Sequence, residues 1–404
     1  METLHELERQ GRYGELTALA KTMLKKDPEN IQGTAVKDWI GKRWRNLFLS
    51  NAEKYFEPMD PGHKKKILGK DKRSDREKIT ARFLRGQGQE EWNIELPPVP
   101  DFRLKNTTLI FCPGFLNGLL PVMAFKDEFP EAAEKFGIHI LQSDSHPVRS
   151  CLGNTDDILN AVEKGIGLDK DGNKTLANPE IPNEKIILLC YSKGMPDALE
   201  LLSIRPDLRN RITAVFNIAG APGGSFLANR FYDLIKDLEI RYEFSREFLY
   251  LLKLINPLVQ IPENFGPVRL NEFDLKGGLL DLTTFRRESF LKEHMDSIND
   301  LKIPFFSLPA FTTAMEVPYF QLQGYLEIDK FDTSNDMQVA YRHSVLNCSM
   351  NTNLALLHGH HWDVCYGPFP KSMRLGSPNL DHHFPKTASL DACIQLAWEL
   401  GLAE

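Results

Sequence analysis

The sequence has few of the features that would place it outside ordinary globular proteins. It has six cysteines in 404 residues and no C-x-x-C pair, so neither a disulfide framework nor a zinc ribbon is indicated. It lacks the run of about 18 apolar residues that a membrane-spanning helix needs. Its first residues, METLHELERQGRYGELTALAK, show no apolar stretch followed by a cleavage site. These absences predict a reduced protein in the cytoplasm.

The chain also lacks an excess of positive charge. With 49 Lys and Arg against 55 Asp and Glu, its net charge is −6, so nucleic acid is not expected as a partner. The charge is nevertheless uneven, because residues 61–85 hold ten Lys and Arg against three Asp and Glu and leave −13 for the remainder. Such a run is either a solvated surface or a peripheral contact with anionic lipid head groups.

Hydrophobic periodicity divides the chain into two parts. Residues 2–25 and 38–56 have the three- and four-residue spacing of amphipathic helices. The segment L-P-P-V-P at 96–100 cannot continue a helix. We therefore predict an N-terminal helical extension over 1–96 and a second domain over 97–404.

In the second part, short apolar runs alternate with helical patterns. This alternation predicts an α/β fold with a mainly parallel sheet covered by helices on both faces. The segment 226–299 interrupts it with a helical, aromatic-rich insertion. The expected strands are 107–111, 137–142, 185–189, 213–219, 303–307 and 353–357, and the expected helices 127–136, 156–164, 196–204 and 390–400.

The sharpest chemical signal is L-L-C-Y-S-K-G at 188–194, where a buried strand turns into a helix. It is close to G-x-S-x-G, in which small outer residues permit a sharp turn that exposes the serine hydroxyl. Cys190 takes the place of the first glycine, Ser192 is the candidate nucleophile, and the Lys193 amide lies at a helix N-terminus, where it can stabilise an oxyanion. The alternative is a strand-to-helix turn with a capping serine.

Further segments resemble the lipase and esterase branch of the α/β-hydrolase superfamily. They cover the chain from about residue 105 onward and leave the first hundred residues unmatched. The segments are P-G-F-L-N-G at 113–118, C-Y-S-K-G at 190–194, G-A-P-G-G-S at 220–225, and N-D-M-Q-V at 335–339 with G-H-H-W-D-V at 359–364.

The resemblance implies a Ser-Asp-His triad in that chain order. N-D-M-Q-V is similar to the family's N-D-G-x-V turn, so Asp336 is the expected acid. The base is expected just after the last strand, directly before an aromatic residue, which favours His361. The rivals are Asp329 and Asp332 for the acid, and His360 and then His358 for the base.

The resemblance also places an oxyanion donor in the loop after the first strand of the sheet. Gly114 allows the backbone to approach the reacting carbonyl, and the amide of Phe115 is the expected donor, with Leu116 as the next candidate. The alternative is a common Pro-Gly turn. The implied chemistry needs no cofactor and no metal. The H-x-H-H cluster at 358–361 also admits a metal site, but no helix spaces its ligands.

The sequence therefore predicts a serine hydrolase of carboxylic esters with apolar acyl chains. Its partner would be a small-molecule or lipid ester, and the insertion at 226–299 would form a lid over the site. The alternatives are a thioesterase, amidase or acyltransferase with the same residues, or a catalytically silent hydrolase fold used for binding.

Overall fold

The computed structural model describes residues 3–55, 72–86, 96–178, 181, 184–240, 246–260, 272–374, 376–377, 380 and 383–404. Within these residues, seven strands form a central sheet in the order β4-β3-β2-β5-β6-β7-β9. All neighbouring strands are parallel except β4, which pairs antiparallel with β3. The strands are β2 (Thr107–Cys112), β3 (His139–Gln142), β4 (Leu168–Asp169), β5 (Lys185–Tyr191), β6 (Ile212–Ile218), β7 (Phe305–Leu308) and β9 (Asn351–Asn353).

The predicted α/β class is confirmed, and five of the expected strands appear with small shifts at their ends. All six residues of β2 are buried, which explains its continuous apolar run. The expected strand at 353–357 is divided instead. Its start belongs to β9, whereas β10 (Leu356–His358) lies in a second sheet, between β1 (Leu84–Arg85) and β8 (Ala310–Phe311).

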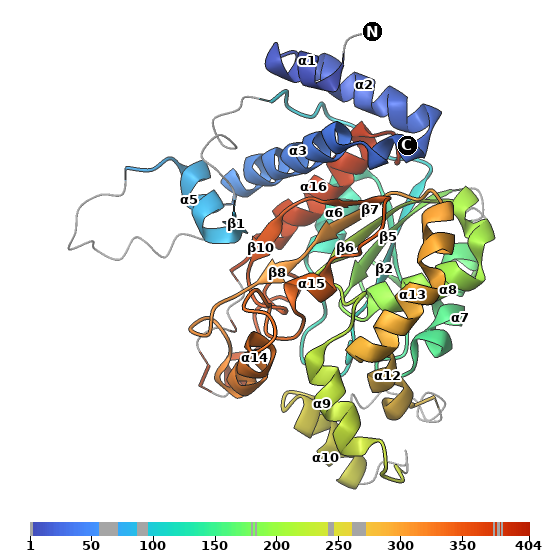
Figure 1. Cartoon of the computed structure of the whole chain (residues 1–404), viewed down its shortest axis with the longest axis vertical. Coiled ribbons are helices and arrows are strands. Elements are labelled where there is room, and N and C mark those ends of the chain that lie inside the picture. Colours follow the sequence, from blue (N-terminus) through green and yellow to red (C-terminus); the bar gives the residue numbers. More distant parts are fainter. Residues whose placement is uncertain are drawn as a thin grey trace.

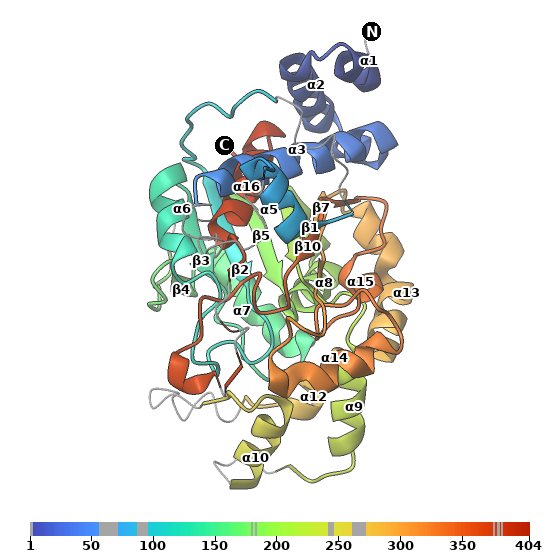
Figure 2. The ribbon, with the colours of Figure 1, turned by 90° about the vertical axis from the view of Figure 1, so that its left-hand side faces the viewer.

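Helices cover both faces of the central sheet (Figures 1 and 2). On one face, α6 (Glu128–Phe136) packs against α16 (Lys386–Glu399), and α3 (Thr34–Glu53) packs over α16. On the other face, α7 (Cys151–Lys164) packs against α8 (Gly194–Ile204), which also contacts α13 (Thr284–Asp300). Among the described residues, no helix combines the length and apolar character needed to cross a membrane.

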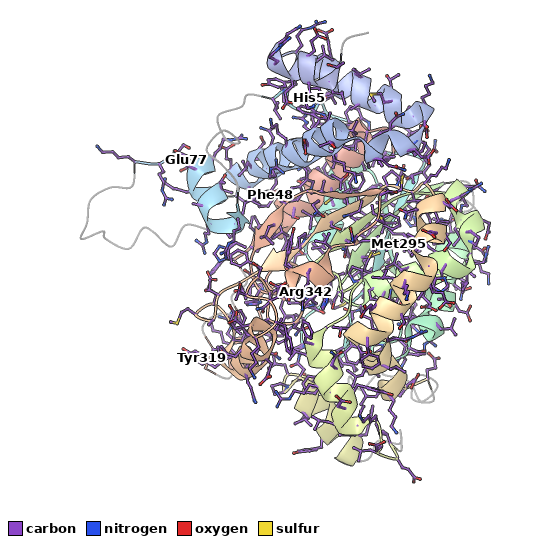
Figure 3. The ribbon with its side chains drawn as sticks, in the orientation of Figure 1. His5, Phe48, Glu77, Met295, Tyr319 and Arg342 are labelled. Carbon is purple, nitrogen blue, oxygen red and sulfur yellow. The ribbon has the colours of Figure 1, made fainter. Side chains whose placement is uncertain are left out.

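The N-terminal helices are joined to the core through α3. The buried guanidinium of Arg43 donates to both carboxylate oxygens of Glu399 on α16, at 2.7 and 2.5 Å. Phe48, labelled in Figure 3, is fully buried and stacks on Trp44 with ring centroids 5.3 Å apart. The predicted helix over 2–25 is two helices, α1 (Leu4–Arg9) and α2 (Tyr13–Lys26), separated at Gly11, whose φ is 69°. The division at residue 96 stays a prediction.

The basic segment 61–85 lies only partly within the described residues. Its residues 61–71 fall outside them. Ser74 and Glu77 form a capping box that begins α5 (Asp75–Phe83), and α5 packs on α3. The next two residues form β1 (Leu84–Arg85), which pairs antiparallel with β10. The contact with a lipid surface stays a prediction.

The segment 226–299 divides into two structural parts. Three of its helices, α9 (Phe226–Ile235), α10 (Arg246–Ile255) and α12 (Leu275–Asp281), lie at the end of the molecule opposite α1 and α2 (Figures 1 and 2). The fourth, α13, belongs to the face of the sheet. The remaining elements are η1 (Pro28–Gln32), η5 (Pro206–Asn210), η6 (Tyr319–Gln321), α14 (Leu322–Asp329), α15 (Tyr341–Ser344) and η7 (Lys371–Met373).

Candidate active site

Ser192 lies in a strained turn between β5 and α8. Its φ is 52°, in the left-handed region that costs energy for a residue with a side chain. A Cβ at Gly194 would lie 2.0 Å from the carbonyl oxygen of Cys112, so this position requires glycine. The residue that caps α8 is Lys193, and α8 has no side-chain cap. The side chain of Ser192 therefore does not cap α8, in contrast to the alternative considered from the sequence.

His361 connects Ser192 to Asp336. Its Nε2 lies 2.9 Å from the Ser192 Oγ, and its Nδ1 lies 2.7 Å from the Asp336 Oδ2. The other oxygen of Asp336 accepts hydrogen bonds from the amides of Gln338 and Val339, at 2.9 and 2.7 Å. A carboxylate oxygen accepts hydrogen bonds, so Nδ1 of His361 carries the hydrogen and donates it to Asp336. Nε2 then carries no hydrogen and can accept the hydrogen bond of the serine hydroxyl.

The turn that holds Asp336 has the backbone that its motif requires. Met337, at the position that is glycine in N-D-G-x-V, has a φ of 77°. The rival Asp332 has another role, since its two oxygens accept from the amides of Ser334 and Arg342. Asp329, the second rival, is the last residue of α14. The structure thus brings Asp336, rather than its rivals, against His361.

The two other histidines of the cluster have different partners. His360 is buried, and its Nδ1 accepts from the amide of Asp363 at 3.1 Å. His358 Nε2 lies 2.9 Å from a carboxylate oxygen of Glu316, and this hydrogen bond lowers the pKa of Glu316 to about 2. Among the described residues, no group of three or more His, Cys, Asp and Glu side chains is arranged to hold a metal ion.

The loop after β2 approaches Ser192 closely. Cys112 and Cys190 are register partners in β2 and β5, so the residues that follow each strand lie side by side. A Cβ at Gly114 would lie 2.8 Å from the Cβ of Ser192. The amides of Phe115 and Lys193 donate no hydrogen bond to an acceptor in the described part of the chain. The amide of Leu116, the second candidate, already donates to the carbonyl of Pro147 at 2.8 Å.

Sequence reasoning missed a contact between Tyr191 and His361. The Tyr191 hydroxyl donates to the main-chain carbonyl of His361 at 2.9 Å, and the two ring centroids are 5.0 Å apart. Burial raises the pKa of Tyr191 well above its usual value, so the hydroxyl remains a donor. The motif that identifies Ser192 accepts any residue at the position of Tyr191, so nothing in the sequence indicated this contact.

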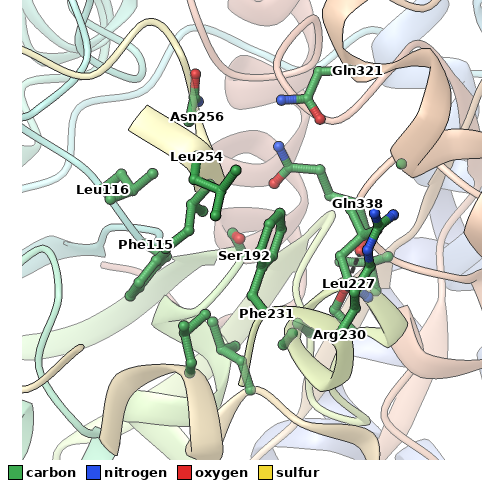
Figure 4. Close-up of a pocket in the computed structure, with 18 of the residues that line it drawn as sticks. Phe115, Leu116, Ser192, Leu227, Arg230, Phe231, Leu254, Asn256, Gln321 and Gln338 are labelled. Atoms are coloured by element: carbon green, nitrogen blue, oxygen red, sulfur yellow. Dashed lines mark hydrogen bonds between the residues drawn. The ribbon is translucent and has the colours of Figure 1, made fainter. Parts of the chain in front are cut away.

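A cavity of about 230 Å³ opens onto Ser192. In Figure 4, Phe115 and Leu116 lie on one side of Ser192, and Leu227, Arg230 and Gln338 lie on the other. The walls are mainly apolar, whereas the polar lining includes the exposed Arg230 and three glutamines. The apolar lining includes Phe115, Leu116, Leu120, Ala221, Leu227, Ala228, Phe231, Leu234, Leu254, Ile255, Leu279, Leu282, Phe320, Val339 and Trp362, and the glutamines are Gln321, Gln323 and Gln338.

Comparison with known proteins identifies the fold. No family model and no curated protein matches the sequence. Among solved structures, a metagenomic carboxyl esterase is similar with a TM-score of 0.59 and 22% identity, over 88% of this chain and 91% of that one. A Bacillus licheniformis lipase in its mature form has a TM-score of 0.40 and 18% identity, over 66% and 89% of the two chains. The Staphylococcus hyicus lipase has a TM-score of 0.42 and 12% identity, over 66% of this chain and 91% of that one. The likeness to the esterase shows that this chain has the α/β-hydrolase fold.

Proposed function

We propose that the protein is a serine hydrolase that cleaves carboxylic esters with Ser192, His361 and Asp336. The observation that carries the proposal is the unbroken hydrogen-bonded series from the Ser192 hydroxyl through His361 to Asp336, at an apolar cavity. A serine hydroxyl becomes a useful nucleophile only when a base accepts its proton and an acid orients that base. The names of the similar esterase and lipases agree with this reaction.

In the proposed reaction, the Ser192 Oγ attacks the ester carbonyl carbon while its proton passes to Nε2 of His361. The carbonyl oxygen becomes an oxyanion, which the amides of Phe115 and Lys193 stabilise. His361 then gives its proton to the leaving alcohol as the ester C–O bond breaks. Water attacks the acyl-enzyme, again with His361 as base, and releases the acid and the free serine.

The cavity favours an apolar acyl group of limited length. Its mainly apolar lining favours an uncharged acyl chain, because most of the walls offer a charge no partner and the one charged side chain among the described lining residues, Arg230, is exposed to solvent. Its volume of about 230 Å³ is below the ~300–1,000 Å³ of typical ligand pockets. We therefore expect the rate to peak at short or medium acyl chains and to fall for long ones.

The test measures hydrolysis of p-nitrophenyl esters from acetate to palmitate, together with labelling by a fluorophosphonate. Ser192→Ala should lose labelling and at least about 10³-fold of kcat, because the covalent route is removed. Ser203→Ala, a serine on α8 outside the cavity lining, is the matched control and should keep both. Asp336→Asn should retain more activity than Ser192→Ala, because the acid orients the base without reacting.

Each result of this test has a distinct meaning. A wild-type protein that neither hydrolyses esters nor reacts with the fluorophosphonate would be a silent hydrolase fold and would overturn the proposal. Faster turnover of a thioester or amide than of the oxygen ester with the same acyl chain would reassign the substrate class.

A further inference from the structure

The side chain of Lys193, the residue after the proposed nucleophile, lies inside the protein. Its Nζ donates to Oδ1 of Asp197 at 2.5 Å, and each side chain is only 1% exposed. Burial lowers the pKa of Lys193, but the charge and hydrogen bond of Asp197, together with other nearby groups, raise it, and the pKa lies above its usual value. The two residues therefore form a charged pair away from water, in which the mutual attraction and the hydrogen bonds must offset the loss of hydration of both ions.

The second oxygen of Asp197 leads to the neighbouring helix. It accepts from Nδ2 of Asn154 on α7 at 2.9 Å. Asn154 is 1% exposed, and its Oδ1 accepts from the main-chain amide of His146 at 3.0 Å. Its Nδ2 also donates to the carbonyl of His146 at 3.3 Å. Asn154 thus ties the Lys193–Asp197 pair to the loop that follows β3.

That loop holds the backbone beside Phe115. The residue after His146 is Pro147, whose carbonyl accepts from the amide of Leu116 at 2.8 Å. Leu116 has a φ of 64°, an uncommon value for a residue with a side chain, so its backbone needs an anchor. Phe115, whose amide is the proposed oxyanion donor, is the residue directly before Leu116. Hydrogen bonds, together with the covalent link from His146 to Pro147, therefore connect the Lys193 side chain to Leu116, the residue after Phe115.

We propose that Lys193, Asp197 and Asn154 are positioning residues that hold the two oxyanion-binding amides at a fixed separation. This proposal rests on the proposed function, because it gives the amides of Lys193 and Phe115 the task of binding the oxyanion. Each amide must lie about 2.7–3.1 Å from the oxyanion to stabilise it. The two amides come from different loops, which the pairing of β2 with β5 places side by side, and the connection between α8 and the loop after β2 then fixes their separation more closely. None of the three side chains is among the described residues that line the cavity, so they act through the backbone.

The experiment cuts the connection at Asn154. Asn154→Leu removes the link to the loop while the Lys193–Asp197 pair remains. We expect kcat on a p-nitrophenyl ester to fall about 10–100-fold, with KM changed less than about threefold, because misplaced donors weaken binding of the transition state alone. Asn51→Leu is the matched control, since Asn51 is also buried and hydrogen-bonded, to Gln395, but lies on α3. It should leave kcat unchanged.

A second readout separates positioning from a general loss of structure. Ser192 adds to the carbonyl of an alkyl trifluoromethyl ketone and forms a tetrahedral oxyanion, whereas the alcohol with the same alkyl chain has no carbonyl or carboxylate oxygen for the two amides to bind. In Asn154→Leu, the inhibition constant of the ketone should rise by the factor that kcat/KM loses, while that of the alcohol stays the same. If Asn154→Leu does not fold, Asp197→Asn replaces it, because the amide keeps the shape of the side chain while its NH2 group must face a donor, either Nδ2 of Asn154 or Nζ of Lys193, and so breaks one of the two contacts.

The outcomes distinguish this proposal from the proposed function. A wild-type protein without esterase activity, or an active Ser192→Ala, refutes the proposed function. An active wild type whose folded Asn154→Leu or Asp197→Asn variant keeps its kcat refutes the positioning network alone. A loss of kcat without weaker ketone binding also refutes it, because the damage would then lie at the base.

Discussion

Gly114 offers the most direct test of how close the loop after β2 lies to the nucleophile. An alanine there would place its Cβ 2.8 Å from the Ser192 Cβ and 3.1 Å from the Tyr191 ring. Carbon atoms prefer separations of about 3.5–4.0 Å, so the loop and the turn would move apart by about 0.7–1.2 Å. Because a misplacement of about 1 Å can cost about 10²-fold in rate, we expect Gly114→Ala to lose about 10²-fold in kcat/KM.

The variant should remain folded, which makes the prediction measurable. Overpacking of this kind costs about 1–3 kcal/mol, against the ~5–15 kcal/mol that stabilises a typical domain. The assay is steady-state hydrolysis of a p-nitrophenyl ester, with the fold checked by circular dichroism. Gly14→Ala on α2 is the control, because a Cβ there meets no atom within 4 Å. A folded Gly114→Ala protein with wild-type kcat/KM would refute the close approach and the donor role of Phe115.

Other predictions follow from the contacts of single side chains. His361→Ala should lose at least about 10³-fold in kcat, whereas His360→Ala, which removes a side chain that accepts from the Asp363 amide and leaves the contact of His361 with Ser192 in place, should stay within about tenfold of wild type. Kinetics of both variants on one ester test this ranking, and the reverse ranking would show that the base is wrongly assigned. Arg43→Met leaves the Glu399 carboxylate buried without its cation and should lower the free energy of unfolding by about 3–5 kcal/mol in urea denaturation, while a loss below about 1 kcal/mol would argue against α3 as part of the core. The pKa of Glu316 is lowered from 4.5 to about 2, so its contribution to stability is complete above pH 4.5 and is lost as the pH falls toward 2. Acid denaturation of Glu316→Gln should therefore depend less steeply on pH over this range, and a wild-type slope would contradict the assignment.

The fold class could be predicted from the sequence because strands buried on both faces are continuous apolar runs. The candidate site could be located because two of its turns need unusual backbone. Ser192 and Met337 have φ values of 52° and 77°, and the motifs around them mark those turns. Chain order then narrowed the choice of base to a cluster of three histidines. The aromatic residue that follows favoured His361 among the three, and the hydrogen bond to Ser192 distinguishes it from the other two in the structure.

Other features depend on tertiary packing that leaves no local pattern. A two-residue strand such as β1 has no periodicity, so its pairing with β10 could not be predicted. Lys193 and Asp197 have the i, i+4 spacing of an ordinary exposed helix pair, and the packing of neighbouring helices on α8 makes the pair buried. The division of the last predicted strand between two sheets depends likewise on β8 and β1, which are distant in sequence.

The packing of α3 on α16 also has a consequence for the order in which the chain folds. The ribosome completes α3 while its partner, almost at the other end of the chain, does not yet exist. At about 5–20 residues per second, the roughly 330 residues between them take about 20–70 s to make. Throughout that time the ring systems of Trp44 and Phe48, fully buried in the finished protein, lack the surface that covers them. The nascent chain therefore exposes the apolar face of α3 from early in synthesis. We expect chaperones that bind exposed apolar segments to raise the yield of folded protein.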